Sequence, residues 1–151
     1  MNFDQIAAFT LGDAQVPDSA LDFAATLLID TLGVAAGAVN MQAGRIARDH
    51  AARFMAASDP ADAAPLLFDG RMASLTGASF ALASQIDNLD GHDGYNPTKG
   101  HIGCAVVPAL CAFGEHMPEL SGRDALAALA VKPSNGKGVL LVGQVNSRKL
   151  L

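Results

Sequence analysis

The sequence predicts an all-α fold for residues 1–131, and two observations carry this prediction. First, apolar residues recur at the three- and four-residue spacing of helices, in segments that begin or end at typical capping residues. Second, small apolar side chains dominate, with 29 alanines among 151 residues and no tryptophan. Small side chains at helix contacts let helices pack closely. We therefore expect a partial helical domain over 1–131 and an atypical tail over 132–151.

The first predicted helix spans residues 17–38. Pro17 suits a first helical turn, and Asp18 lies at the favourable end of the helix dipole. Apolar residues surround the segment on nearly all sides, which is typical of a buried helix. Asp30 and Thr31 interrupt its longest apolar run. We expect this run to be too short and too polar for a membrane span, which needs about 20 apolar residues.

A second, amphipathic helix is predicted over 44–56. Its apolar stripe consists of Ile46, Ala47, Ala51 and Phe54. The charged residues expected on the solvent side are Arg45, Arg48, Asp49 and Arg53. After it, residues 58–65 are expected to form a loop, and residues 66–70 a short extended segment with a turn.

Two further helices are predicted over 74–88 and 101–116, separated by a polar segment. Small residues in the first of them would allow a close neighbour. Pro108 within the second removes a backbone donor and predicts a kink. Ser121 is expected to cap a last helix, with Asp124 at the capping-box position in place of the usual, longer Glu.

Composition excludes several classes of protein. Half of the residues are hydrophobic and only 17% are charged, so the chain is not intrinsically disordered. A net charge of −5 argues against a nucleic-acid partner, whose footprint is basic. The N-terminus lacks the pattern of a secretory signal. Cys104 and Cys111 would lie roughly 10 Å apart along one helix, beyond disulfide reach. Two unpaired thiols favour a reducing, cytoplasmic location.

Chemistry-bearing side chains concentrate in residues 87–103, which contain three Asp, two His, one Lys and one Tyr. Ordinary turn formation is one explanation, because Asp-Gly and Asn-Pro pairs are common in turns. The glycine spacing does not match an EF-hand, and the His and Asp spacing matches no specific zinc motif. Neither cysteine lies beside a histidine, and no serine stands in a nucleophile elbow. We predict no metal and no cofactor.

Proton transfer beside a carboxylate fits this segment better. Such chemistry needs an acid, a base and donors that hold the carboxylate. His101 is expected to begin a helix, where free amides and the dipole attract anions. Lys99 adds positive charge, and Asp87 ends the preceding helix. His92 and Tyr95 are secondary candidates, although a solvated loop position explains His92 equally well.

Two stretches resemble the MmgE/PrpD family. Residues 30–38 read DTLGVAAGA, similar to a helix near the start of family members. Residues 87–94 read DNLDGHDG and residues 101–110 read HIGCAVVPAL, similar to the family's D…DGH…GHxG…PA segment. The resemblance covers residues 4 to 130. The family includes 2-methylcitrate dehydratase, cis-aconitate decarboxylase and iminodisuccinate epimerase.

The resemblance implies a cofactor-independent lyase or isomerase that acts on small di- or tricarboxylates. It also implies a helical domain beside a smaller α+β domain, usually in a dimer. Asp87 and His101 would be the catalytic residues, and Lys99, His92 and Asp90 would hold the substrate. Leu89 stands where many members have Asp, so Asp87 and Asp90 remain rival matches.

Family members run to several hundred residues, so the resemblance implies a truncated chain that is incomplete and inactive alone. The tail over 132–151 would then come from a shifted reading frame, a premature stop or an artificial end point, or be disordered. The expected partners are a small carboxylate substrate and a second copy of the chain, which would associate through exposed apolar surface. No nucleic acid or membrane partner is expected. A small helical binding module, holding a metal through residues 87–101, is the alternative. The third hypothesis is a chain that does not fold stably.

Overall fold

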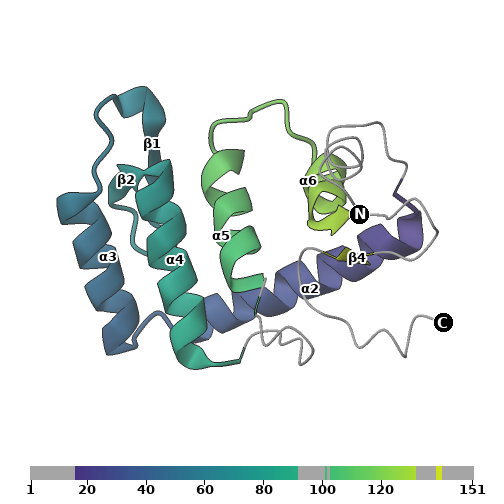
Figure 1. Cartoon of the computed structure of the whole chain (residues 1–151), viewed down its shortest axis with the longest axis horizontal. Helices are drawn as coiled ribbons and strands as arrows, with labels where there is room; N and C mark the ends of the chain where they lie inside the picture. The colour runs from purple at the N-terminus through teal and green to yellow at the C-terminus, as the bar shows by residue number, and fades with distance from the viewer. Residues whose placement is uncertain (1–15, 92–100, 102, 132–138, 141–151) are drawn as a thin grey trace, which may run out of the picture.

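The computed structural model describes residues 16–91, 101, 103–131 and 139–140, and within them it confirms the all-α prediction (Figure 1). The helices are α2 (Asp18–Gly37), α3 (Gln42–Phe54), α4 (Leu75–Leu89), α5 (Gly103–Gly114) and α6 (Gly122–Leu129), with a 3-10 turn at Pro60–Asp62. The strands are β1 (Ala63–Pro65), β2 (Met72–Ser74), β3 (Ala130–Val131) and β4 (Val139–Leu140). Each strand belongs to an antiparallel two-stranded pair. Most of the tail beyond residue 131 lies outside the described residues.

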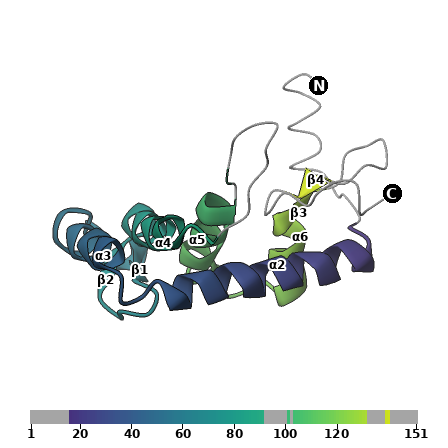
Figure 2. The ribbon, with the colours of Figure 1, turned by 90° about the horizontal axis from the view of Figure 1, so that it is seen from below.

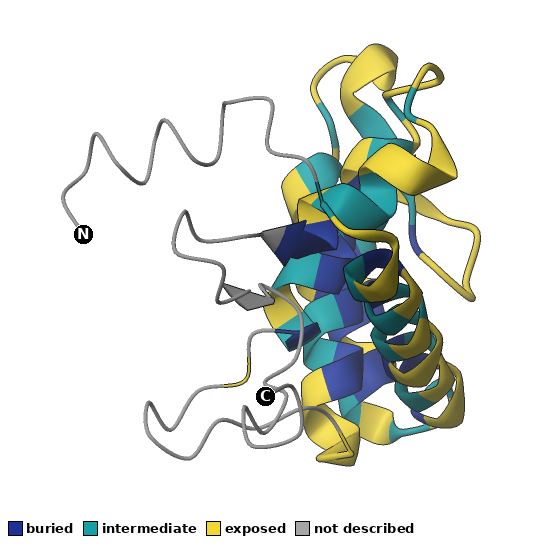
Figure 3. Cartoon of the chain, turned by 90° about the vertical axis from the view of Figure 1, so that its right-hand side faces the viewer, coloured by how far each residue is buried: buried dark blue, intermediate teal, exposed yellow. Residues whose placement is uncertain are grey.

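The helices α3, α4 and α5 stand side by side, and the long helix α2 runs across one side of this row (Figures 1 and 2). Helix α4 lies between α3 and α5 and packs against both. Helix α2 contacts α4, α5 and α6. Buried residues line the faces where helices meet, while the outer faces are exposed (Figure 3). The fold is therefore one layer of helices covered on one side by α2.

Helix α2 corrects two expectations. It is not a buried helix, because the row covers only one stripe of it, formed by Leu21, Ala24, Thr31 and Ala35, whereas Ile29 is 71% exposed. Its length and apolar composition also differ from the expectation, because by themselves they are compatible with a membrane span. Among the described residues, α2 is the one helix whose length and mean hydropathy would suffice to cross a membrane, a test that core helices of soluble proteins also pass.

The predicted orientation of α3 is wrong in part. Arg48, expected in solvent, is only 7% exposed, while Ile46 and Phe54 from the expected apolar stripe are 60% and 65% exposed. The face that α3 turns inward consists of Gly44, Ala47, Arg48 and Ala51. Small residues let α3 approach α4 closely, and the guanidinium of Arg48 finds polar partners in the interior. A prediction from the charge pattern alone therefore gives the wrong limits for the buried face of this helix.

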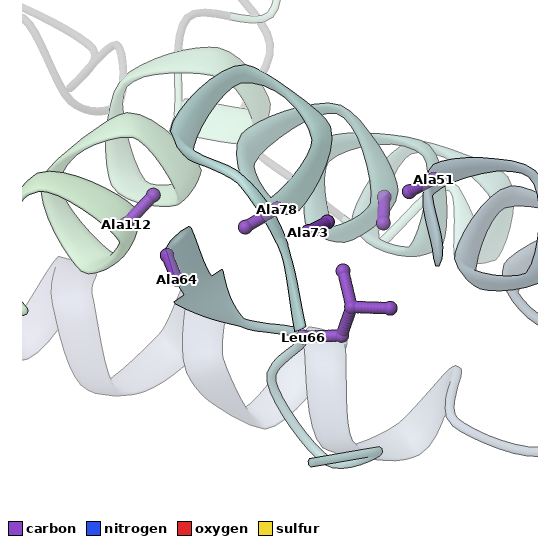
Figure 4. Packing of buried hydrophobic residues seen from close by; sticks show 7 residues of the cluster. Ala51, Ala64, Leu66, Ala73, Ala78 and Ala112 are labelled. Carbon is purple, nitrogen blue, oxygen red and sulfur yellow. The ribbon is translucent and has the colours of Figure 1, made fainter. Parts of the chain in front are cut away.

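A short hairpin follows α3 where a loop and an extended segment were expected. Its strands pair Ala64 with Ala73, and the turn between them carries positive φ angles at Phe68 (65°) and Gly70 (82°). The hairpin closes an alanine-rich cluster between α3, α4 and α5 (Figure 4). This cluster consists of Ala51, Ala64, Leu66, Ala73, Ala78, Ala81 and Ala112. Its small side chains account for the close packing that the composition predicted.

The predicted Ser121 cap is confirmed, and Ser74, which the sequence placed at the start of a helix, caps that helix as well. The Ser74 hydroxyl accepts a hydrogen bond from the Gly77 amide at the start of α4 (3.1 Å), as a helix N-cap does. The Ser121 hydroxyl accepts from the Asp124 amide (3.1 Å) and donates to the Asp124 carboxylate (2.6 Å). Pro108 lies inside α5, and Cys104 and Cys111 are not joined by a disulfide, as expected.

Candidate functional site

Asp87 lies in the last turn of α4, and its side chain is exposed. Asp90 ends this helix in the left-handed conformation (φ 55°, ψ 27°), and its amide donates to the Asp87 carbonyl oxygen (3.1 Å). Asn88 also folds back, donating to the Ser84 carbonyl (2.7 Å). The two rival carboxylates are thus both exposed at the same helix end, three residues apart.

His101 is exposed and precedes α5, which begins at Gly103. The expectation that His101 itself begins the helix is therefore off by two residues. The Cys104 thiol, in the first turn of α5, donates to the His101 carbonyl oxygen (3.1 Å). This bond ties the backbone of His101 to the start of the helix.

Helices α4 and α5 pack side by side and run in opposite directions (Figure 1). The end of α4 and the start of α5 therefore lie at the same end of the pair, which places Asp87 and His101 at that end. Lys99 and His92, and also Tyr95, lie outside the described residues. The fold thus brings together the two predicted catalytic residues and Asp90 at one end of a helix pair.

The end of α4 is held against the end of α2 by close contacts. A Cβ added at Gly37 would lie 3.3 Å from the Leu89 side chain, and one added at Gly91 would lie 3.5 Å from Val34. Ile86, one residue before Asp87, is fully buried. The last turn of α4 is therefore packed tightly against α2. The exposed carboxylates of Asp87 and Asp90 belong to this well-packed helix end.

Ionisable groups other than the candidate residues, Asp69 and Cys111 among them, have shifted pKa values. A hydrogen bond from Arg71 lowers the pKa of Asp69 from 3.8 to about 2. Burial raises the pKa of the Cys111 thiol, and the nearby Glu115 carboxylate adds to that shift. No group of three or more His, Cys, Asp or Glu side chains among the described residues could hold a metal ion.

A buried polar network that was not predicted from the sequence lies next to the last turn of α4. Arg48 and Gln85 are 7% and 1% exposed, and they hydrogen-bond to each other and to the end of α2. A polar residue on the inward face of α4, at helical spacing from the buried Ala78 and Leu82, was the available signal for Gln85. For Arg48 the sequence offered none, since an arginine beside Asp49 and Arg53 looks like a solvated helix face.

The structure is that of a helical domain in which Asp87 and His101 are exposed at one end of two antiparallel helices. Residues 5–132 match the family model described as the MmgE/PrpD N-terminal domain. The chain therefore belongs to the MmgE/PrpD family, as the two motif stretches indicated. Neither a curated protein nor a solved structure gives a significant match to this chain.

Proposed function

We propose that this chain carries the acid–base part of a lyase or isomerase site for small di- or tricarboxylates. One observation carries the proposal: the family match spans all five candidate residues, and the antiparallel α4–α5 pair gathers Asp87 and His101 at one end. Both side chains are exposed there, so a substrate in solution can reach them.

Each residue has a distinct role in the proposed reaction. Asp87 takes or returns a proton next to the substrate carboxylate, and His101 supplies the complementary acid or base. Lys99 and His92 hold the carboxylate by charge and hydrogen bonds, with Asp90 orienting a substrate hydroxyl. The reaction needs no cofactor, because proton abstraction and elimination require only acids, bases and charge stabilisation. The site works in the cytoplasm, where small carboxylates are in free solution.

Binding and turnover test the two parts of the proposal separately. We expect cis-aconitate and 2-methylcitrate to perturb the NMR signals of Asp87 and His101, and a double variant, Asp87→Asn with His101→Asn, to abolish binding. We also propose that turnover requires chain beyond the N-terminal domain, so the 151 residues alone should show none. Saturable binding without turnover is the expected result. No binding would contradict the site, and clear turnover would contradict the need for further residues.

A further inference from the structure

Two buried polar side chains, Arg48 of α3 and Gln85 of α4, meet beneath the last turn of α4. Arg48 donates to the Gln85 amide oxygen, to the Val39 carbonyl (2.9 Å) and to the Asp69 carboxylate (3.2 Å). Gln85 in turn donates to the Ala35 carbonyl (2.7 Å). The pair therefore joins α3 and α4 to the C-terminal end of α2.

The end of α2 explains why these partners are needed. The last four carbonyls of a helix have no donor within the helix, and this end of the dipole favours a cation. Helix α2 has no basic residue in its last turn. Gln85 supplies a donor to the Ala35 carbonyl in this last turn, and Arg48 places a cation next to the helix end, where it donates to the Val39 carbonyl.

The space that Arg48 and Gln85 occupy depends on the glycine at position 44. A Cβ added at Gly44 would lie 3.2 Å from Cγ of Gln85 and 3.4 Å from Nη1 of Arg48. Both contacts would be tight, so a side chain at position 44 would crowd Gln85 and Arg48, and glycine avoids this. A buried arginine is costly unless its hydrogen bonds are made, which makes the arrangement well determined.

Gln85 stands two residues before Asp87 in α4, so the two side chains point about 200° apart around the helix axis. Fixing the buried side chain therefore fixes the rotation of the turn that presents Asp87 to solvent. We propose that Arg48 and Gln85 are positioning residues that hold Asp87 for the acid–base site, a role that rests on the proposed function. Because both side chains are buried, they would act through Asp87 and not by touching the substrate.

The test compares Gln85→Met with Leu129→Ala in the full 151-residue chain. Methionine keeps the length of the side chain and removes both hydrogen bonds. Leu129 is 1% exposed in a different cluster, with Ala24 and Val107, so its truncation lowers stability without touching the network. The readouts are the Kd of cis-aconitate from NMR shifts and the hydrogen exchange rates of the amides over 87–90.

We expect Gln85→Met to weaken binding on the order of tenfold and to speed exchange over 87–90 selectively, since small displacements of acid–base groups are costly. Leu129→Ala should lower the Tm while its Kd stays within about twofold of the parent chain. Gln85→Glu keeps the acceptor for Arg48 and should recover part of the affinity.

Three outcomes would overturn the assignment in different ways. Equal binding by Gln85→Met and the parent chain would refute the positioning role and leave the proposed function standing. An equal loss of affinity in Leu129→Ala would reduce the effect to general stability and also refute it. Failure of the parent chain to bind would refute the proposed function, and the positioning role with it.

Discussion

Asp69 and Arg71 show how single side chains fix the hairpin. Arg71 Nε donates to Asp69 (2.6 Å), and its Nη2 also donates to Asp49 of α3 (2.7 Å). The other oxygen of Asp69 accepts from the buried Arg48. One carboxylate thus joins an exposed arginine of the hairpin to a buried arginine of α3. Its pKa is held at about 2 because its charged form has these partners.

This lowered pKa predicts acid sensitivity. The folded pKa lies near 2 and the unfolded pKa near 3.8, so the stabilisation by Asp69 is complete above pH 3.8 and is lost as the pH falls towards 2. We expect Asp69→Asn to lower the Tm at pH 7 and to reduce the fall in Tm across that interval, measured by circular dichroism. Asp30→Asn, on the exposed side of α2, is the control. An unchanged fall in Asp69→Asn would contradict the assignment.

Helices α4 and α2 each contain a glycine, and the two positions differ in how close the neighbouring atoms lie. In α4, a Cβ at Gly77 would lie 2.9 Å from both the Cβ and the backbone oxygen of Met55, at the end of α3. In α2, a Cβ at Gly33 would meet nothing within 4 Å. Both glycines lie inside helices, but only Gly77 is needed for the packing of its helix on a neighbour.

Alanine substitution at these two positions should therefore have opposite effects. In a helix interior, alanine is favoured over glycine by about 1 kcal/mol, so Gly33→Ala should raise the free energy of unfolding by up to that amount. Gly77→Ala forces α3 and α4 apart and should lower it by about 1–3 kcal/mol despite the same gain in propensity. Urea denaturation measures both. A stabilised Gly77→Ala would show that the α3–α4 contact is loose.

The whole molecule leaves large apolar side chains uncovered on the outer side of α3 and α4. Phe54 and Phe80 are 65% and 44% exposed, and the ring of His50 lies 5.2 Å from the first and 5.9 Å from the second. The guanidinium carbon of Arg53 lies 4.9 Å from the centre of the Phe54 ring. Aromatic residues and arginine are the types enriched in protein interfaces. The many apolar residues of the chain therefore lie on its surface as well as in its core.

We predict that this aromatic surface drives self-association. The double variant Phe54→Ser with Phe80→Ser should lower the average mass in sedimentation equilibrium and should leave the helical circular dichroism spectrum unchanged. Ile29→Ser, which removes a 71% exposed apolar side chain from α2, is the matched control and should have the smaller effect. A parent chain that is monomeric at all concentrations would contradict the prediction.

The sequence alone determined the helical class, the approximate limits of α2 and α4, the Ser121 cap at the start of α6, and the family. These depend on local periodicity, on capping chemistry and on motif order, all of which are written along the chain. The candidate site could be predicted as a set of residues, because Asp87 and His101 flank one polar segment of the sequence between two predicted helices. Their common position then follows from the antiparallel pairing of α4 and α5.

Only the tertiary structure decided which side of each helix is buried. The pattern of α3 favoured burying Ile46 and exposing Arg48, but Arg48 is buried and donates to the Val39 carbonyl just after α2. Likewise α2 is apolar all round, yet one layer of helices covers only its stripe from Leu21 to Ala35. Burial depends on where neighbouring elements supply partners, and that is a property of the assembled fold.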